Sequence, residues 1–462
     1  MNNGWFLQDL MTAIADQGRS LLPSSLFGED EEEGLQKLVD LLMSGRGEAS
    51  GVAIARQLLN HYHVLEDDSQ RLAFFRYVGA IFEPESDVII AAARAYEAEP
   101  SERTYAALQA AVESRRQEFF RRLNLAPGGT AEIVRMRADM LRFLKKHPEL
   151  SVVDRDMVHL LQSWFNRGFL VLRPIDWHTP ATILDRIIAY EAVHEIRGWD
   201  DLKRRLDPVD RRCFGYFHPS MVDEPLIFVE VALMTEIPDA IGDVIDENRK
   251  REGQATPQPT TAVFYSISNC QAGLKGISFG NFLIKHVVEE LIREVPSLKT
   301  FVTLSPVPGF AAWLDRQLTN SPDFFTDAER DALALLPNDA WHRDAKAIAA
   351  LTPVLQALAA HYFVTARNDT GNVIDPVARF HLGNGARLER INMLGDPSRK
   401  GLREAHGLMV NYLYEPREIE KNHEAFANEG KVAASRTVRS LVKRPNPGQP
   451  KPRPGMKLLP AN

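Results

Sequence analysis

The pattern of apolar positions divides the chain into two parts. Up to about residue 165, apolar residues recur at spacings of three and four, which is typical of successive amphipathic helices. Ile133, Met136 and Met140, for example, fall on one helical face, and Thr130 is a candidate N-cap before them. Because each apolar face needs a partner, this part is predicted to be an all-helical bundle. Its helices are expected at residues 35–42, 51–65, 70–82, 87–98, 101–123 and 130–144.

From about Leu170 the pattern changes to short apolar, β-branched and aromatic runs that alternate with helical segments. Such alternation predicts an α/β or α+β domain that begins near Arg167-Gly168. From Lys431 onward the chain contains Lys, Arg, Pro and Gly without Asp or Glu, which predicts a disordered tail. We therefore expect a helical domain (1–166), a mixed domain (167–428) and a basic tail (429–462). In the mixed domain we expect strands at residues 226–233, 262–267 and 300–304, and helices at residues 279–294, 311–318 and 347–365.

Composition narrows the class of protein. The chain has 462 residues, of which 44% are hydrophobic and 25% charged, as in globular proteins. A net charge of -7 argues against nucleic acid as the main partner. No stretch approaches about 18 uninterrupted apolar residues, and the start lacks the regions of a signal peptide. We therefore expect a cytoplasmic protein with no membrane partner.

Metal-ligand patterns are missing from the sequence. Cys213 and Cys270 are the two cysteines and lack a CxxC spacing, which excludes a disulfide scaffold and a thiolate zinc cluster. His61 and His63 have no carboxylate or third histidine at ligand spacing. No metal site is predicted, and these two histidines are assigned no role.

The segment from residue 263 to 285 is the most informative part of the chain. A predicted strand runs into a loop that contains Gly273, Gly276 and Gly280 and then opens a helix. Glycines let the backbone approach a ligand, and the free N–H groups of a helix start favour an anion such as a pyrophosphate. A glycine-rich turn without a ligand is equally compatible with the spacing. The Rossmann GxGxxG spacing and the GK[ST] ending of a P-loop are both missing.

This loop resembles the coenzyme A loop of acetyltransferases with the Gcn5-like fold. A sharper resemblance is to the malonyl-CoA decarboxylase family, whose motifs occur in the same order between residues 264 and 414. These motifs are Tyr265-Ser266-Ile267-Ser268, residues 271–280, Phe282-Leu283-Ile284-Lys285, Leu304-Ser305-Pro306-Val307-Pro308-Gly309-Phe310, Asp375-Pro376-Val377, Phe380-His381-Leu382, Asn384-Gly385-Ala386 and Gly407-Leu408-Met409-Val410-Asn411-Tyr412.

The resemblance implies both a fold and an activity. The fold would be an N-terminal all-helical bundle followed by a Gcn5-like acetyltransferase-type mixed α/β catalytic domain. The activity would be that of a carbon-carbon lyase that converts malonyl-CoA to acetyl-CoA and carbon dioxide in fatty acid metabolism. Because the thioester carbonyl can absorb the resulting carbanion as an enolate, no cofactor or metal is needed. The family is tetrameric, so a homo-oligomer, either a tetramer or a dimer, is expected.

The resemblance also assigns site residues. Ser305 would relay a proton as an acid/base group, and His381 would be its partner and proton donor. From the local sequence alone, Ser305 would be a Ser-Pro turn residue and His381 a half-buried strand residue that enters a hairpin. The family's pyrophosphate contacts correspond to Lys275, Gly276, Ile277, Ser278, Phe279, Gly280 and Asn281.

Five further residues are candidates for substrate binding: Gln271, Gly273, Asn384, Asn411 and Tyr412. The last three offer neutral donors that could hold the malonyl carboxylate or orient His381, because amides and phenols donate without carrying charge. Alternatively, they are hairpin and core residues.

Two departures from the family pattern and three other functions remain. Met393 stands where the family has Trp, and the end of the chain lacks the Ser-Lys-Leu of animal members, which favours a bacterial cytoplasm.

A Gcn5-like acyltransferase, a Ser-His thioesterase and a non-catalytic coenzyme A-binding scaffold are the alternatives. No GxSxG surrounds Ser305, as a thioesterase elbow would require. Release of carbon dioxide without an acceptor would distinguish a decarboxylase from a transferase.

Overall fold

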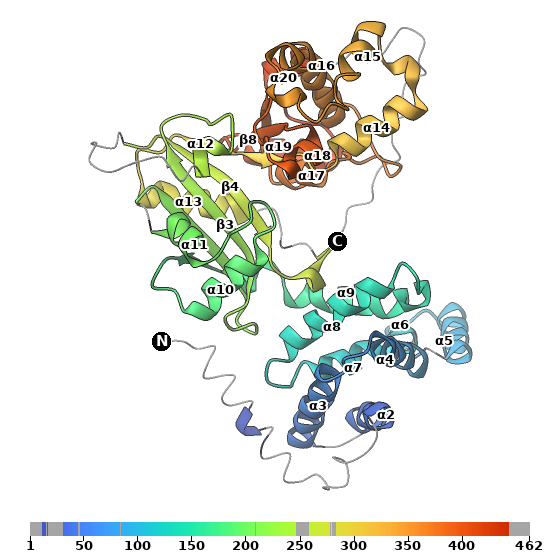
Figure 1. Cartoon of the computed structure of the whole chain (residues 1–462). Helices are drawn as coiled ribbons and strands as arrows, with labels where there is room; N and C mark the ends of the chain where they lie inside the picture. The colour runs from blue at the N-terminus through green and yellow to red at the C-terminus, as the bar shows by residue number, and fades with distance from the viewer. Residues whose placement is uncertain are drawn as a thin grey trace. The chain divides into compact units, whose positions relative to one another are not determined.

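The computed structural model describes residues 12–14, 16, 31–44, 47–83, 85–207, 209–245, 258–277, 279 and 283–442. The chain forms two compact units, which are described separately (Figure 1). The division differs from the boundaries expected from sequence, because two short segments of the mixed region group with the helical bundle. Unit 1 comprises Met1–Arg173, Tyr216–Ile227 and Asn269–Gly280, and unit 2 comprises Pro174–Gly215, Phe228–Ser268 and Asn281–Asn462.

Unit 1 contains the helical N-terminal region that the sequence predicts. Its helices are α2 (Glu31–Leu42), α3 (Glu48–His63), α4 (Asp68–Ile81), α5 (Ser86–Ala98), α6 (Glu102–Val112), α7 (Arg115–Leu123), α8 (Gly129–Phe143) and α9 (Ser151–Trp164), with 3₁₀ turns at Pro148–Leu150 and Arg167–Phe169.

Local capping sets two helix boundaries that periodicity did not find. The segment expected as one helix over residues 101–123 is two helices, because the Ser114 side chain accepts a hydrogen bond from Arg116 N and starts α7. The expected N-cap at Thr130 is also wrong. Gly128 occupies that position in a left-handed conformation, and the Thr130 hydroxyl instead donates to Asn124 Oδ1 at 2.7 Å. At the starts of both α7 and α8, the local capping and turn interactions, and not the apolar periodicity, determine where the helix begins.

The core of unit 1 combines aromatic packing with a buried ion pair. Phe119 and Phe120 of α7 are fully buried, and their rings pack edge to face. On the same helix, Arg116 Nε donates to Asp156 Oδ2 of α9 at 2.7 Å. A buried charge without its partner is strongly destabilising, so this pair fixes how α7 lies against α9.

A mixed sheet follows the helical region, as expected. Its strands are β1 (Val171–Ile175), β2 (Arg211–Phe217), β3 (Pro225–Met234), β4 (Thr261–Asn269), β5 (Thr300–Thr303), β6 (Ser305–Pro306), β7 (Arg387–Asn392) and β8 (Met409–Leu413). Among the described residues they form an eight-stranded sheet in the order β1-β2-β3-β4-β5-β8-β6, with β7 also paired to β8.

The helices of the mixed region include those expected and several shorter ones. They are α10 (Ala181–Tyr190), α11 (Trp199–Leu206), α12 (Gly242–Ile245), α13 (Leu283–Glu294), α14 (Phe310–Asn320), α15 (Asp327–Leu333), α16 (Ala345–Val364), α17 (Pro376–Gly383), α18 (Arg399–Ala405), α19 (Ile419–Glu429) and α20 (Arg436–Leu441), with 3₁₀ turns at Ala272–Leu274, Pro322–Phe324 and Trp341–Arg343.

The parallel strands β4 and β5 separate toward their carboxyl ends. Their paired register ends at Phe264 and Thr303, although β4 continues to Asn269. The antiparallel pairing with β8 continues past this point, from Val302 with Leu413 to Ser305 with Val410. Carboxyl ends of parallel strands are common ligand positions, so a functional site is expected where these two strands separate.

Helix α16 is long and apolar enough to cross a membrane by length and composition alone. In the structure it packs against α15, α20 and β7 of the same unit. Leu351, Leu355 and Leu358 on this helix are fully buried. This is the burial expected of a core helix.

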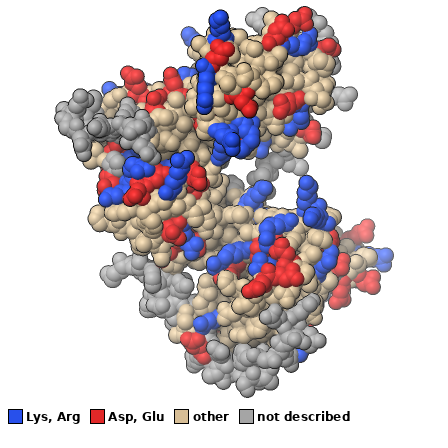
Figure 2. Space-filling model, in the orientation of Figure 1, with Lys and Arg blue, Asp and Glu red and all other residues tan. Residues whose placement is uncertain are grey.

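Charged side chains largely intermingle on the face drawn in Figure 2. Among the described residues, exposed charged side chains form local ion pairs, such as Arg142 with Asp68 at 3.0 Å and Arg121 with Glu113 at 3.0 Å. Exposed pairs of this kind contribute little stability each. Their effect is mainly to balance charge locally.

The expected disordered tail is wrong for the residues up to 442. Leu388 N in β7 donates to Ala433 O, and Ser435 N donates back to Leu388 O, both at 2.9 Å. The Ser435 side chain then caps α20, whose Val438 is fully buried. The physical reason is tertiary, because strand β7 and helix α16 offer partners that composition does not reveal. Residues 443–462 lie outside the described residues.

Removal of this segment tests its contribution. A chain that ends after Glu429 should lose about 2–4 kcal/mol of unfolding free energy, since it forfeits the buried Val438 and the backbone bonds to β7. A chain that ends after Val442 keeps both features and serves as the control. Differential scanning calorimetry measures the difference, and equal melting temperatures for the two truncations would contradict the packing role.

Candidate active site

Ser305 and His381 meet in a buried site of unit 2. Ser305 begins β6, directly after the point where β4 and β5 separate, and His381 lies on α17. The Ser305 Oγ lies 3.1 Å from His381 Nε2. The two residues are only 5% and 3% exposed, so their hydrogen bond is shielded from water.

Thr303 holds the serine in place. Ser305 Oγ donates to Thr303 Oγ1 at 2.8 Å, and the backbone N–H of Tyr412 donates to the same oxygen at 3.1 Å. Thr303 and Ser305 share one face of the strand because they are two residues apart. Sequence reasoning did not single out Thr303, and its position two residues before Ser305 was the available signal.

Tyr414 holds the other side of the imidazole. Its hydroxyl lies 2.8 Å from His381 Nδ1. If Tyr414 donates to Nδ1, then Nε2 carries the proton and donates to Ser305, whose hydroxyl donates on to Thr303. A continuous chain of hydrogen bonds therefore orients a neutral imidazole. Tyr414 was also missed from the sequence, where it falls two residues beyond the last motif.

The helical placement of His381 corrects the sequence-based expectation of a strand before a hairpin. Asp375 caps α17 by accepting from Ala378 N at 2.8 Å, and Pro376 occupies the first turn. The helix ends at Gly383, and Gly385 then adopts φ +80 before β7 begins. The Asp-Pro pair was therefore a helix start signal that the turn residues after His381 had obscured.

Burial controls the charges in this site. It lowers the pKa of His381 to about 3, because the site has no room for solvation of an imidazolium. Burial also raises the pKa values of Tyr412 and Tyr414 well above their ordinary value. The imidazole and both phenols are thus neutral near pH 7.

Tyr412, a candidate substrate residue, lies directly against His381. The two rings stack with centroids 4.6 Å apart and an angle of 24° between planes. The Tyr412 hydroxyl is buried and has no hydrogen-bond partner among the described residues. A buried phenol without a partner is costly, so this O–H is available to a bound ligand.

The two asparagine candidates are engaged elsewhere. Asn411 Nδ2 donates to Thr303 O at 2.9 Å and to Pro238 O at 3.3 Å, which favours the core alternative for this residue. Asn384 caps the end of α17, and its Nδ2 donates to Phe380 O at 2.7 Å. Its Oδ1 is buried without a partner among the described residues, but that atom is an acceptor and does not bind a carboxylate.

The described part of the expected pyrophosphate loop belongs to unit 1, where Arg137 of α8 holds it. Arg137 Nη1 donates to the carbonyl oxygens of Gly273 at 2.6 Å and Lys275 at 2.9 Å, and its Nε donates to Asp154 Oδ1 at 2.8 Å. Arg137 is 3% exposed. The helical bundle, to which sequence analysis assigned no site residue, therefore fixes the shape of this loop.

The glycines of the loop have different reasons to be glycine. A Cβ on Gly273 would lie 1.8 Å from Val134 O, so this residue lets the loop pack against α8. Gly276 adopts φ +82 and faces open space, as a loop that approaches a ligand would. The Gln271 side chain donates to Pro225 O at 3.0 Å. Ile277 is buried, whereas Lys275 is exposed and Phe279 is half-buried; Ser278, Gly280 and Asn281 lie outside the described residues.

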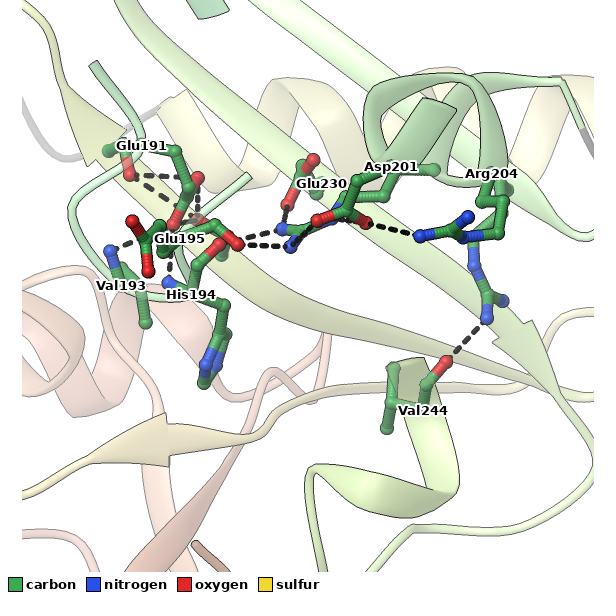
Figure 3. Close-up of polar contacts among 12 residues, drawn as sticks. Glu191, Val193, His194, Glu195, Asp201, Arg204, Glu230 and Val244 are labelled. Carbon is green, nitrogen blue, oxygen red and sulfur yellow. Dashed lines mark hydrogen bonds and ion pairs between the residues drawn. The ribbon is translucent and has the colours of Figure 1, made fainter. Parts of the chain in front are cut away.

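A second polar cluster binds β4 beyond its last pair with β5 (Figure 3). Glu191, just after α10, accepts from Ser266 Oγ at 2.7 and 2.9 Å and from the backbone N–H groups of Val193 and His194 at 2.8 and 2.7 Å. Ser266 belongs to one of the family-like motifs. Glu191 thus joins the loop that follows α10 to the part of β4 that extends beyond its last pair with β5.

Arg205 of α11 anchors the same loop from the other end. It donates to the carbonyl oxygens of His194 and Glu195, both at 2.9 Å, and pairs with the fully buried Glu230 at 3.2 Å (Figure 3). Burial raises the pKa of the Glu230 carboxyl, and the neighbouring guanidinium partly offsets this. None of these partners had a sequence signature.

No metal centre is evident within the described ranges, which contain no group of three or more His, Cys, Asp or Glu side chains able to hold an ion. The groups around the Ser305–His381 pair are a hydroxyl, an imidazole and the phenols of Tyr412 and Tyr414.

Comparison with family models gives two matches that follow one another along the chain. Residues 82–165 match the malonyl-CoA decarboxylase N-terminal domain, and residues 168–451 match the malonyl-CoA decarboxylase C-terminal domain. The mitochondrial malonyl-CoA decarboxylase of Anser anser anser is 36% identical over 351 residues, which are 71% of this chain and 69% of that protein. The Rattus norvegicus enzyme is 36% identical over 358 residues, 72% of each chain.

Solved structures give the same result. The crystal structure of malonyl-CoA decarboxylase from Rhodopseudomonas palustris superposes with a TM-score of 0.85 at 52% identity, covering 89% of this chain and 100% of that one. The enzyme from Agrobacterium vitis gives a TM-score of 0.83, also at 52% identity and with the same coverage.

The neutral state of His381 can be measured directly. Its ¹⁵N shifts should report a neutral imidazole from pH 8 down to pH 5, because burial disfavours the charged form, whereas free histidine titrates around pH ~6.5. Since the unfolded chain binds this proton more readily, stability should fall as pH drops from ~6.5 toward 3. The His381→Asn variant assigns the signal. An imidazole that protonates near pH ~6.5 in the folded protein would show that water solvates His381 and would contradict the prediction.

Proposed function

The chain belongs to the malonyl-CoA decarboxylase family, and we propose that it converts malonyl-CoA to acetyl-CoA and carbon dioxide with Ser305 and His381 as its catalytic pair. The observation that carries the assignment of the pair is the 3.1 Å contact between Ser305 Oγ and His381 Nε2 in a buried, neutral site. Both residues also stand in the family-like motifs.

The reaction makes four demands on the protein. Cleavage of the bond between C2 and the carboxylate carbon leaves a carbanion that the thioester carbonyl delocalises as an enolate. The protein must orient the carboxylate, place donors where the enolate oxygen becomes negative, exclude water and deliver a proton to C2. A buried site with neutral donors meets these demands, and it favours departure of neutral carbon dioxide over retention of a buried carboxylate.

We assign the proton delivery to a relay through Ser305. Burial lowers the pKa of His381, whereas the negative charge of a bound malonyl carboxylate raises it. The imidazole therefore takes up a proton when the substrate binds. As the enolate forms, Ser305 donates its hydroxyl proton to C2 and recovers one from His381 Nε2. The imidazole ends neutral, and one proton is consumed for each carbon dioxide released. Tyr414 serves both states, because its hydroxyl can donate to or accept from Nδ1.

Tyr412 is the best-supported donor to the substrate. Its hydroxyl is buried beside His381 and has no partner among the described residues. Its raised pKa keeps the proton on the phenol, so it can stabilise oxygen charge without adding charge of its own.

Coenzyme A binding is assigned to the loop of residues 275–281. Two observations on its described part support this assignment, the left-handed Gly276 that faces open space and the attachment of the Gly273 and Lys275 carbonyl oxygens to Arg137. With those carbonyl oxygens turned toward Arg137, the loop surface is less repulsive to phosphate oxygens.

We further propose that the enzyme needs no cofactor or metal and acts in the cytoplasm, in fatty acid metabolism. The first point follows from the chemistry, because the thioester itself is the electron sink. The proposals of a cytoplasmic location and of a role in fatty acid metabolism rest on the sequence alone.

Substitution of the catalytic pair should affect turnover rather than binding. Ser305→Ala and His381→Asn are each expected to lower kcat about a hundred- to ten-thousand-fold, because their contribution arises only as the carbon–carbon bond breaks. A carbon dioxide release assay with malonyl-CoA and no acceptor measures kcat, and calorimetry measures the Kd of coenzyme A. Near-normal release by both folded variants would disprove the site assignment.

Two further variants serve as controls for this experiment. Gly276→Val should weaken coenzyme A binding first, because valine disfavours φ +82 and adds a side chain to the loop surface. Ser440→Ala removes an exposed hydroxyl of α20 and should change neither kcat nor Kd. No carbon dioxide release from the unaltered protein would count against the activity itself.

We propose that the enzyme self-associates through α5 and α6. These helices pack together and leave Val88, Ile90, Tyr105 and Val112 between 45% and 50% exposed. Exposed apolar side chains gathered on one helix pair are typical of interfaces, and a second copy offers the same surface.

Light scattering tests this interface. The unaltered protein should be a dimer or tetramer at micromolar concentration, and the double variant Ile90→Glu, Tyr105→Glu should dissociate, since it would bury charge in the interface. Val209→Glu alters a residue of unit 2 that is 83% exposed and should leave the assembly intact. A monomeric unaltered protein, or a double variant that stays assembled, would rule out this surface.

A further inference from the structure

Unit 2 contains a cavity of about 550 Å³ that none of the proposed catalytic residues lines. One wall is helix α14, with Trp313, Arg316 and Gln317. The opposite wall is the loop between α16 and α17, with Arg367, Asn368 and Ile374. Its volume lies within the usual range of small-molecule sites, roughly 300–1,000 Å³.

The cavity carries unbalanced positive charge. Arg316 is exposed and forms no hydrogen bond or ion pair with any described residue. Arg367 is half-buried and donates to the carbonyl oxygens of Ala366 and Gly430, without a carboxylate among its described partners. Burial lowers the pKa of this guanidinium, as expected for a charge that lacks a counter-ion. Asp369 is the one carboxylate in the lining, so two guanidinium groups face a single negative charge.

The walls are built without a ligand. Asn368 Oδ1 accepts from the backbone N–H groups of Thr370 at 3.1 Å and Asn372 at 2.9 Å, and Arg367 pairs with Val373 across the loop. Trp313 is 3% exposed and stacks on the His361 ring. A preformed wall lowers the ordering cost of binding.

We propose that this cavity is a binding site for a small organic anion with a phosphate or carboxylate group, held by Arg316 and Arg367. Guanidinium groups match such oxygens with paired, charge-assisted hydrogen bonds. Gln317 and Asn368 supply neutral polar groups at the same cavity, and Trp313 contributes apolar surface. The cavity lies wholly in unit 2 and shares no lining residue with the loop of residues 275–281.

The cavity is also coupled to the catalytic helix. Ile374 of its wall directly precedes Asp375, whose carboxylate caps α17 and so fixes the helix of His381. Tyr362, which follows His361 on α16, donates to the same carboxylate at 3.4 Å. An anion bound by Arg367 shifts the loop that leads to Asp375 and so alters the cap of α17. Occupancy of the cavity therefore changes kcat at saturating substrate.

Calorimetry on the full chain tests the binding. Saturating coenzyme A is present throughout, so that the loop of residues 275–281 is filled and cannot bind the probe. Inorganic pyrophosphate and citrate are titrated separately, because one represents phosphates and the other carboxylates. We expect at least one of them to bind, and the double variant Arg316→Gln, Arg367→Gln to weaken that binding about tenfold or more.

Two matched variants separate a site from general attraction to a basic surface. Ala366→Phe fills the cavity without changing charge and should also abolish binding, whereas Arg403→Gln removes an exposed arginine of α18 and should not. Circular dichroism and melting temperature check that each variant is folded. Absence of binding by both probes, or equal binding by the filled and unfilled cavity, overturns the proposal.

Turnover provides the test of the coupling. The anion that binds should alter kcat of the unaltered protein at saturating malonyl-CoA, where competition for the coenzyme A loop has no effect. The Arg316→Gln, Arg367→Gln variant should show no such response. Binding without any change in kcat would overturn the coupling and leave the binding site standing.

Discussion

The separation of β4 from β5 is the constraint on which the active site depends. A regular parallel pair would bury the backbone of Ser305 between two strands. Instead the register with β4 stops at Thr303, while the antiparallel pairing with β8 continues from Val302 to Ser305. Beyond the last pair between β4 and β5, the Ser305 hydroxyl contacts His381, and Glu191 binds Ser266 of β4.

The same arrangement explains why the site is neutral. Thr303, Tyr414 and the imidazole form hydrogen bonds that need no net charge, and burial makes any net charge costly. A malonyl carboxylate that enters such a site brings a charge that burial disfavours, and it leaves as neutral carbon dioxide. The energetic preference of the pocket and the direction of the reaction therefore coincide.

The helical bundle has a role in the ligand loop that its own sequence did not suggest. Arg137 of α8 binds two loop carbonyl oxygens, and Val134 of the same helix packs so closely that residue 273 must be glycine. One glycine of the loop is therefore explained by packing and another, Gly276, by backbone conformation at an open surface. A loop held from behind can present its remaining N–H groups at a lower ordering cost.

The sequence by itself determined the class of each region and singled out the proposed catalytic pair. Periodicity found the helical bundle and the strands around residues 226–233, 262–267 and 300–304, because burial of one face is a local demand on each element. Family-like motifs singled out Ser305 and His381 because their flanking residues form recognisable local patterns.

Only the tertiary structure decided which groups surround that pair. Thr303, Tyr414, Glu191 and Arg137 carry no motif, since each acts through a partner distant in sequence. The segment after Lys431 looked unable to fold by composition, yet the edge of β7 and the surface of α16 order it up to residue 442. Spacing and composition report what a segment can bury by itself, whereas contacts between distant segments depend on where the whole chain brings them together.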